Sequence, residues 1–154
     1  MKEMSFMTRD KSGQYIIRNI RKSEIGLLKD FLYEAVFVPE GVESPPRDIV
    51  DRPEQRVYTD AFGTVGSVWT RIMDDYGHVD DETPSCAVSL YKEYRGQGIG
   101  SQLMMKMLDL LRQKGYKKVS LSVQKANYAV KMYEKAGFKT VDENEEEYIM
   151  AAEL

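Results

Sequence analysis

Residues 85–101, SCAVSLYKEYRGQGIGS, constrain the fold more than any other part of this chain. An apolar run typical of a buried strand leads into a glycine-rich turn, which continues directly into a helical pattern. Gly96, Gly98 and Gly100 remove side chains from the turn, so several backbone N–H groups can point outward beside the positive end of the helix. The segment therefore predicts a pyrophosphate-binding loop, in which Arg95 adds a cation for a phosphate oxygen.

Two other phosphate motifs also place glycines ahead of a helix. A P-loop needs lysine and then serine or threonine after its last glycine, whereas this loop continues as Gly100-Ser101-Gln102. A dinucleotide-binding loop needs G-x-G-x-x-G and an acidic residue about 20 positions further on. Here the spacing is G-x-G-x-G, and the corresponding region, residues 119–122, reads VSLS. Neither motif fits.

Residues 95–100, RGQGIG, resemble the R-x-x-G-x-G acetyl-CoA loop of the GCN5-related N-acetyltransferase (GNAT) superfamily. The preceding residues 90–96, LYKEYRG, are similar to the end of the family's pyrophosphate strand, except that Lys92 stands where the family has proline. A second family segment, N-x-x-A-x-x-x-Y-x-x-x-G-F, is matched by residues 127–138, NYAVKMYEKAGF. Two separated motifs occur in the family's order, so the resemblance covers the second half of the chain.

The bulk properties fit one soluble domain over residues 1–154. The composition is 42% hydrophobic and 31% charged, and a net charge of -3 gives no reason to expect nucleic acid as a partner. The only cysteine, Cys86, cannot form an internal disulfide and is expected to be a buried structural thiol. No apolar run has the length of a signal peptide or a membrane span. We expect a cytoplasmic protein without a membrane partner.

The chain alternates strand and helix patterns, which predicts an α/β domain with a mixed sheet. The family resemblance implies a mixed central sheet flanked by helices, with splayed parallel strands forming the acetyl-CoA cleft. We read the acidic run at residues 142–147 as a solvated hairpin turn and not as a site. Strands are predicted over residues 15–20, 65–72, 85–91 and 117–123 and in a hairpin of 138–143 with 147–154; helices are predicted over 23–36, from 45 to about 58, and over 98–114 and 128–136.

One family strand has no counterpart in the sequence. Family members usually place two strands between the second helix and the pyrophosphate strand, and here there is room only for residues 65–72. Either the protein has lost the strand expected between Asp60 and Val65, or the sequence omits a stretch. Omission is favoured, because losing a strand would expose a sheet edge and part of the core.

The resemblance also implies the roles of individual residues. Backbone groups near Leu90 would hold the pantetheine arm, and the Leu90 N–H would polarise the acetyl carbonyl. Tyr133 occupies the family's general-acid position, and a tyrosine hydroxyl with a pKa near 10 suits protonation of a leaving thiolate; the alternative is an aromatic side chain that only packs. Asn127 contacts pantetheine or simply caps its helix. The implied cofactor-binding residues are Val88, Ser89, Leu90, Tyr91, Arg95, Gly96, Gln97, Gly98, Ile99, Gly100, Ser101, Asn127 and Tyr133.

A base or a chain of water molecules must accept the proton of the attacking amine, because an alkylammonium has no lone pair. Glu82 is the first candidate, since acidic groups before the central strand often serve this purpose in the resembled family. Asp81, Asp80 and the only histidine, His78, are the others. For each of them taken singly, a solvated loop residue is the favoured interpretation.

The sequence therefore predicts an N-acetyltransferase that moves an acetyl group from acetyl-CoA to a primary amine by direct attack in a ternary complex, without a metal. Acidic segments at 74–82 and 142–147 weakly favour a cationic acceptor, either a small molecule or a peptide. Two alternatives stay open: a catalytically inactive CoA-binding module, and an acyltransferase with another acyl-CoA. Family members are often homodimers, so a dimer is possible here.

Overall fold

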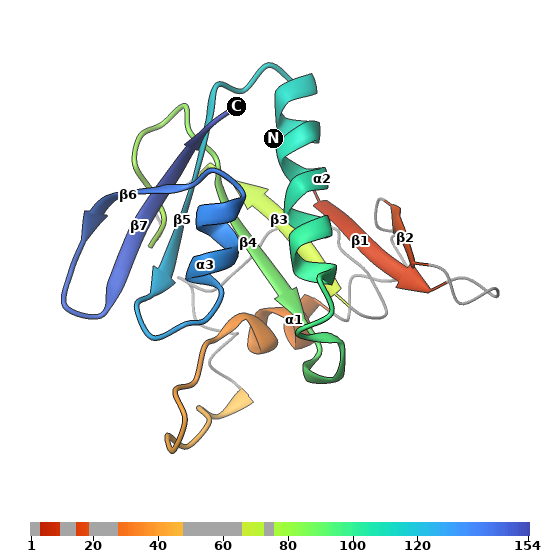
Figure 1. The fold of residues 1–154 in the computed structure, drawn as a ribbon, viewed down its shortest axis with the longest axis vertical. Coiled ribbons are helices and arrows are strands. Elements are labelled where there is room, and N and C mark those ends of the chain that lie inside the picture. Colours follow the sequence, from red (N-terminus) through yellow and green to blue (C-terminus); the bar gives the residue numbers. More distant parts are fainter. Residues whose placement is uncertain (1–3, 10–14, 19–27, 48–65, 73–75) are drawn as a thin grey trace.

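The computed structural model of the chain describes residues 4–9, 15–18, 28–47, 66–72 and 76–154. Its centre is one seven-stranded sheet in the order β2-β1-β3-β4-β5-β7-β6 (Figure 1). All neighbouring strands are antiparallel except β4 and β5, so the sheet is mixed, as predicted. The elements are β1 (Met4–Arg9), β2 (Tyr15–Arg18), α1 (Leu28–Ala35), β3 (Gly66–Arg71), β4 (Ser85–Leu90), the short 3-10 helix η4 (Lys92–Tyr94), α2 (Ile99–Gln113), β5 (Lys118–Gln124), α3 (Val130–Lys135), β6 (Lys139–Glu143) and β7 (Glu147–Glu153).

Most elements predicted from residue 85 onward are confirmed. The helix expected over 98–114 is α2, the strand over 117–123 is β5, the helix over 128–136 contains α3, and the final hairpin is β6–β7. The strand at 15–20 corresponds to β2 and the helix at 23–36 to α1, whose predicted start lies outside the described residues. The helix expected from 45 to about 58 falls largely on residues 48–65, which also lie outside them.

The edge of the sheet beside β3 is covered by a strand that the sequence did not predict. β1 pairs antiparallel with β3, with Met4 opposite Trp69 and Met7 opposite Gly66, and β2 continues the sheet outward from β1. The edge that a missing strand would leave open is therefore filled by the N-terminal segment. The absence of the family strand therefore does not expose this edge, which removes the argument for an omitted stretch of sequence; residues 60–65 themselves lie outside the described residues.

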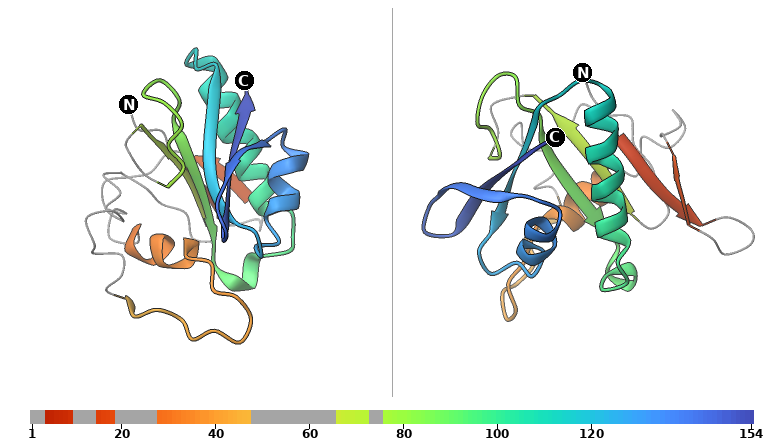
Figure 2. Two further views of the ribbon diagram at one scale, coloured as in Figure 1. Left: turned by 90° about the vertical axis from the view of Figure 1, so that its left-hand side faces the viewer. Right: turned by 45° about the horizontal axis from the view of Figure 1, so that its top comes forward.

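Helices cover both faces of the sheet. α2 and α3 lie on one face and α1 on the other (Figure 2). The apolar stripe of α2 recurs at helical spacing and is completely covered, because it packs on the central strands. Its members Ile99, Leu103, Met107 and Leu111 are at most 1% exposed. No helix in the described ranges is long and apolar enough to cross a membrane.

β4 and β5 meet at one end only. Ser85 pairs with Ser120, and the Ser120 N–H donates a hydrogen bond to the Pro84 carbonyl. Beyond that point no further pair joins these two parallel strands in the described part of the sheet. They splay apart toward Leu90 and Gln124, which confirms the predicted splay and opens a gap in the middle of the sheet.

Candidate active site

A pocket of about 800 Å³ lies at this gap between β4 and β5. Residues 85–90 of β4 and 122–124 of β5 form its sides. The glycine loop, residues 127–129, Met132 and Tyr133 close it on the face covered by α2 and α3. Residues 32–38, in and after α1, border it on the opposite face. The pocket therefore has one wall on each face of the sheet, and the gap between β4 and β5 joins the two sides.

The glycine loop has the conformation that its sequence predicts. Gly96 and Gly98 have φ values of 72° and 78°, a left-handed conformation that favours glycine. Gly98 is the N-cap of α2, where no side chain satisfies the first N–H groups of the helix. A Cβ added to Gly100 would lie 3.3 Å from Met132 Sδ and 3.4 Å from Leu90 Cδ1, so the helix start packs closely beside β4 and α3. Donors and space suited to a diphosphate thus meet at the mouth of the pocket.

Arg95 connects this loop to α1. Its Nε donates a 3.0 Å hydrogen bond to the Leu90 carbonyl, and its Nη2 donates 3.0 Å hydrogen bonds to the carbonyl and to Oε2 of Glu34. The cation also lies at the C-terminal turn of α1, where the helix dipole favours positive charge. In this structure the Arg95 guanidinium holds two walls of the pocket together, and its pairing with phosphate stays a prediction.

Most of the residues predicted to bind the cofactor come together here. Three do not line the pocket. Tyr91 stacks against Phe31 with ring centroids 4.8 Å apart, Gln97 donates a hydrogen bond to the Glu93 carbonyl, and the Ile99 side chain is buried in the core. Asn127 borders the pocket, and its Oδ1 accepts a hydrogen bond from the Ala129 N–H just before α3, while its contact with pantetheine stays a prediction. The predicted residues that line the pocket are Val88, Ser89, Leu90, Arg95, Gly96, Gly98, Gly100, Ser101, Asn127 and Tyr133.

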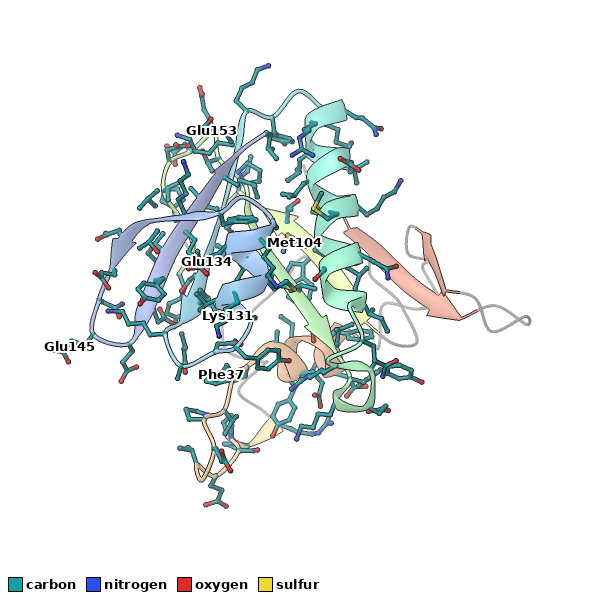
Figure 3. The ribbon with its side chains drawn as sticks, viewed as in Figure 1. Phe37, Met104, Lys131, Glu134, Glu145 and Glu153 are labelled. Carbon is teal, nitrogen blue, oxygen red and sulfur yellow. The ribbon has the colours of Figure 1, made fainter. Side chains whose placement is uncertain are left out.

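Tyr133 reaches the pocket from α3. Lys131 and Glu134 point outward from this helix (Figure 3), whereas Tyr133 is 7% exposed and its ring meets the edge of Phe138 at 5.9 Å. Burial, followed by the neighbouring Cys86 and Tyr128, raises the pKa of Tyr133 above its usual value. The hydroxyl therefore carries its proton throughout the physiological pH range. Cys86 itself is buried in the core, as predicted.

The acidic candidates before β4 do not reach the pocket. Glu82, Asp80 and Asp81 are exposed and His78 is partly buried, and none of the four lines the pocket. Asp80 accepts hydrogen bonds from the backbone N–H groups of Glu82 and Thr83 at 3.0 and 2.6 Å. A hydrogen bond with the Thr83 side chain is the main cause that lowers the Asp80 pKa. His78 lies 3.7 Å from Asp81. These residues shape the turn that leads into β4.

The sequence reasoning missed a carboxylate that does line the pocket. Glu147 begins β7, opposite Gln124 of β5, and its Oε2 accepts a 3.1 Å hydrogen bond from the Ser122 hydroxyl. It is the last residue of the acidic run that we interpreted as a solvated turn. That interpretation holds for the exposed residues 142–146 but not for Glu147. The alternation of residues 147–153, EYIMAAE, was the available signal, because it places Tyr148, Met150 and Ala152 on the core face and Glu147 on the other.

Comparison with protein families agrees with this geometry. Residues 28–138 match the model of the Acetyltransferase (GNAT) family, and the chain belongs to that family. A ribosomal protein bS18-alanine N-acetyltransferase of Haemophilus influenzae is 36% identical over 62 residues. That match spans 40% of this chain and 42% of the relative.

Solved structures share the fold over the whole chain. The PaiA N-acetyltransferase of Thermoplasma acidophilum, solved in complex with coenzyme A, has a TM-score of 0.63 at 17% identity and matches 100% of this chain and 99% of its own. The GNAT domain of PAT from S. lividans also has a TM-score of 0.63, at 14% identity, with 97% of both chains covered. At such identities the likeness shows the fold alone.

Proposed function

We propose that the protein is an acetyl-CoA-dependent N-acetyltransferase, which transfers the acetyl group to a primary amine by direct attack in a ternary complex. The observation that carries the proposal is the gap between β4 and β5, which borders a glycine loop at a helix start and has Tyr133 and Glu147 in its lining. Family membership and the CoA complex of the Thermoplasma relative support the donor.

The chain offers two kinds of contact to the donor. N–H groups at the start of α2 would bind the diphosphate, and the backbone of residues 88–90, which has no pairing partner on β5, would receive the pantetheine arm along the gap. Acetyl-CoA supplies an acetyl group that is activated as a thioester. A backbone donor at Leu90 would stabilise the negative charge that develops on the acetyl oxygen, an effect typically of about 3 kcal/mol.

The two walls provide an acid and a base on opposite faces of the sheet. Tyr133 belongs to the core cluster beneath α2 and α3. Glu147 and Ser122 lie on the other face, because Val123 and Tyr148, their neighbours in sequence on β5 and β7, pack toward that core. The donor would occupy the Tyr133 side, and the amine would approach from the α1 side. We therefore propose Glu147, in place of Glu82, as the proton acceptor.

The transfer balances with these two groups. The amine nitrogen forms a bond to the acetyl carbon, and the carbon–sulfur bond of the thioester breaks. The ammonium group gives up two protons: one passes to the Glu147 carboxylate before attack, directly or through water, and the second leaves the nitrogen for solvent as the tetrahedral intermediate collapses. The Tyr133 hydroxyl gives its proton to the departing thiolate and regains one from solvent. No covalent acyl-enzyme is required.

The test is CoA release from acetyl-CoA, followed with a thiol reagent, across primary amines that include peptides, amino acids, polyamines and aminoglycosides. A control without amine corrects for Cys86 and for hydrolysis. Amine-dependent release, with acetylated product in the mass spectrum, is the expected result. Tight acetyl-CoA binding without transfer to any amine would instead indicate a CoA-binding module, and release only from another acyl-CoA would reassign the donor.

A further inference from the structure

The wall of the pocket on the α1 face contains buried polar groups that have no hydrogen-bond partner among the described residues. Trp69 and Ser89 line the pocket at 2% and 4% exposure. In the described part of the chain, Trp69 Nε1 and Ser89 Oγ are buried without a hydrogen-bond partner, and so is Ser67 Oγ. Buried polar groups are nearly always paired, since leaving one unpaired is costly. Trp69 and Ser89, unlike Ser67, belong to the pocket lining, so their unpaired groups point to a ligand that pairs with them.

These groups are neighbours on one face of the sheet. In the antiparallel register Ser67 lies opposite Ser89, and Trp69 lies opposite Ala87. Val68 belongs to the core beneath α2, so the alternation of β3 turns Ser67 and Trp69 toward α1. Ser89 lies next to the β4–β5 gap, and Trp69 is one strand further away. Diagonal neighbours of this kind are about 7 Å apart, which is the length of two residues in an extended peptide.

The charged residues that line the pocket favour an acceptor with a single positive charge. Among the described residues, the carboxylates that line the pocket belong to Glu34 and Glu147. Glu34 is already paired with Arg95, which leaves Glu147 for the incoming amine. Lys92 and Arg95 also line the pocket and repel additional cations. The indole N–H of Trp69 can only donate, so an ammonium group, which also only donates, cannot pair with it.

We infer that the acceptor is the amino terminus of a peptide: one primary amine followed by carbonyl oxygens. The amine lies at the gap near Glu147, and the carbonyls of the first residues run over β4 toward β3. There they accept hydrogen bonds from the Ser89 hydroxyl and the Trp69 N–H. This inference rests on the proposed acetyl transfer, and it excludes polyamines as preferred acceptors.

The first part of the test measures binding without turnover. Trp69 is the only tryptophan of the chain, so its fluorescence reports directly on this wall. The protein, saturated with CoA, is titrated with trialanine amide, with hexylamine as a singly charged amine without carbonyls, and with spermidine. Half-saturation by trialanine amide at a concentration at least about tenfold below those of the other two is expected. Equal or tighter binding of spermidine would overturn the inference.

The second part of the test removes the indole N–H of Trp69 and keeps an aromatic ring at that position. Trp69→Phe is expected to weaken trialanine amide about tenfold by calorimetry, and to leave hexylamine and acetyl-CoA binding unchanged. Equal losses for the peptide and hexylamine, or none, would contradict the assignment. Unchanged acetyl-CoA affinity shows that the variant is folded. If Trp69→Phe does not fold, Ser89→Ala, measured at saturating CoA, compares trialanine amide with hexylamine, with a smaller expected loss for the peptide.

The two proposals fail in different ways. If the wild-type protein binds trialanine amide selectively but transfers no acetyl group to it, the proposed function falls and the peptide subsite stands. If spermidine is acetylated with the higher kcat/KM, the acetyltransferase stands and the peptide inference falls.

Discussion

The two walls of the pocket are built in opposite ways. On the side proposed for the donor, here called the donor wall, the glycine loop and the start of α2 form one contiguous segment that presents backbone groups. On the side proposed for the acceptor, here called the acceptor wall, Trp69, Ser89 and Glu147 come from three strands and present side chains. The donor wall depends on local conformation, whereas the acceptor wall depends on the register of the sheet. A chain can therefore keep its donor while single substitutions on the strands change its acceptor.

Tyr133→Phe is expected to have the largest effect, because it removes the only proton donor proposed for the thiolate and keeps the buried ring. We expect kcat to fall by about 100-fold with acetyl-CoA affinity unchanged. Steady-state kinetics and acetyl-CoA titrations check both values. Tyr116→Phe, outside the pocket, is the matched control. An unchanged kcat in Tyr133→Phe would reduce this residue to a packing role.

The pH dependence follows from the direction of the Tyr133 shift. Burial raises the pKa of this hydroxyl, so the acid stays protonated as pH rises toward 10. The kcat/KM of the wild type should therefore increase as the amine loses its proton and show no decline up to about pH 10. A rate that falls between pH 7 and pH 9 would show that another group, with a lower pKa, acts as the acid.

Glu147→Gln tests the acceptor wall. We expect a loss of kcat of up to about 100-fold near pH 7, where the amine arrives protonated. The deficit should shrink as pH rises toward the amine pKa, because free amine then needs no base. Glu145→Gln, at the tip of the same hairpin (Figure 3), is the control and should behave as the wild type. A deficit that is constant with pH would indicate that Glu147 has only a structural role.

Gly98→Ala tests whether donor binding depends on the backbone conformation of the glycine loop. Gly98 and Gly115 both have positive φ, 78° and 86°, and an added Cβ meets nothing within 4 Å at either. Alanine is strained at both positions, typically by about 1–3 kcal/mol. Both variants should lose thermal stability, but only Gly98→Ala should weaken acetyl-CoA, by about tenfold. Equal acetyl-CoA affinities in the two variants would show that the glycine loop does not contribute to donor binding.

Glu34→Gln probes the connection between the two walls and should have the smallest effect. It removes the charge that pairs with Arg95 and keeps the backbone carbonyl as an acceptor. Because partly exposed ion pairs contribute about 0–1 kcal/mol, we expect at most a fivefold rise in the KM of acetyl-CoA. Asp30 lies on the same helix as Glu34 and forms an exposed ion pair with Arg47; Asp30→Asn breaks this pair and should leave the KM of acetyl-CoA unchanged. A rise in the KM of acetyl-CoA as large as the loss of affinity in Gly98→Ala would indicate that Arg95 contacts the phosphate directly.

The donor wall could be predicted from the sequence, because its determinants are local. Glycines at fixed spacing set the conformation of Gly96 and Gly98, and the helical pattern after them sets α2. Tyr133 followed from a motif that includes its own helix. In each case one short segment contains both the functional residues and the backbone conformation that positions them.

The acceptor wall could not be predicted, because pairing across the sheet determines it. Nothing near Glu147 in the sequence shows that it lies opposite Gln124, one strand from the gap. Glu82 was favoured because it precedes the central strand, but a turn stabilised by Asp80 leaves it exposed outside the pocket. β1 was missed for the same reason, since its pairing with β3 joins segments about 60 positions apart.

The most direct test of the account is initial-rate kinetics with acetyl-CoA and trialanine amide varied together, with the intact protein mass recorded after incubation with acetyl-CoA alone. An acid and a base that act on one ternary complex predict intersecting double-reciprocal lines and an unchanged protein mass. Parallel lines, together with a protein heavier by one acetyl group, would show a covalent acyl-enzyme and contradict direct transfer between the two walls.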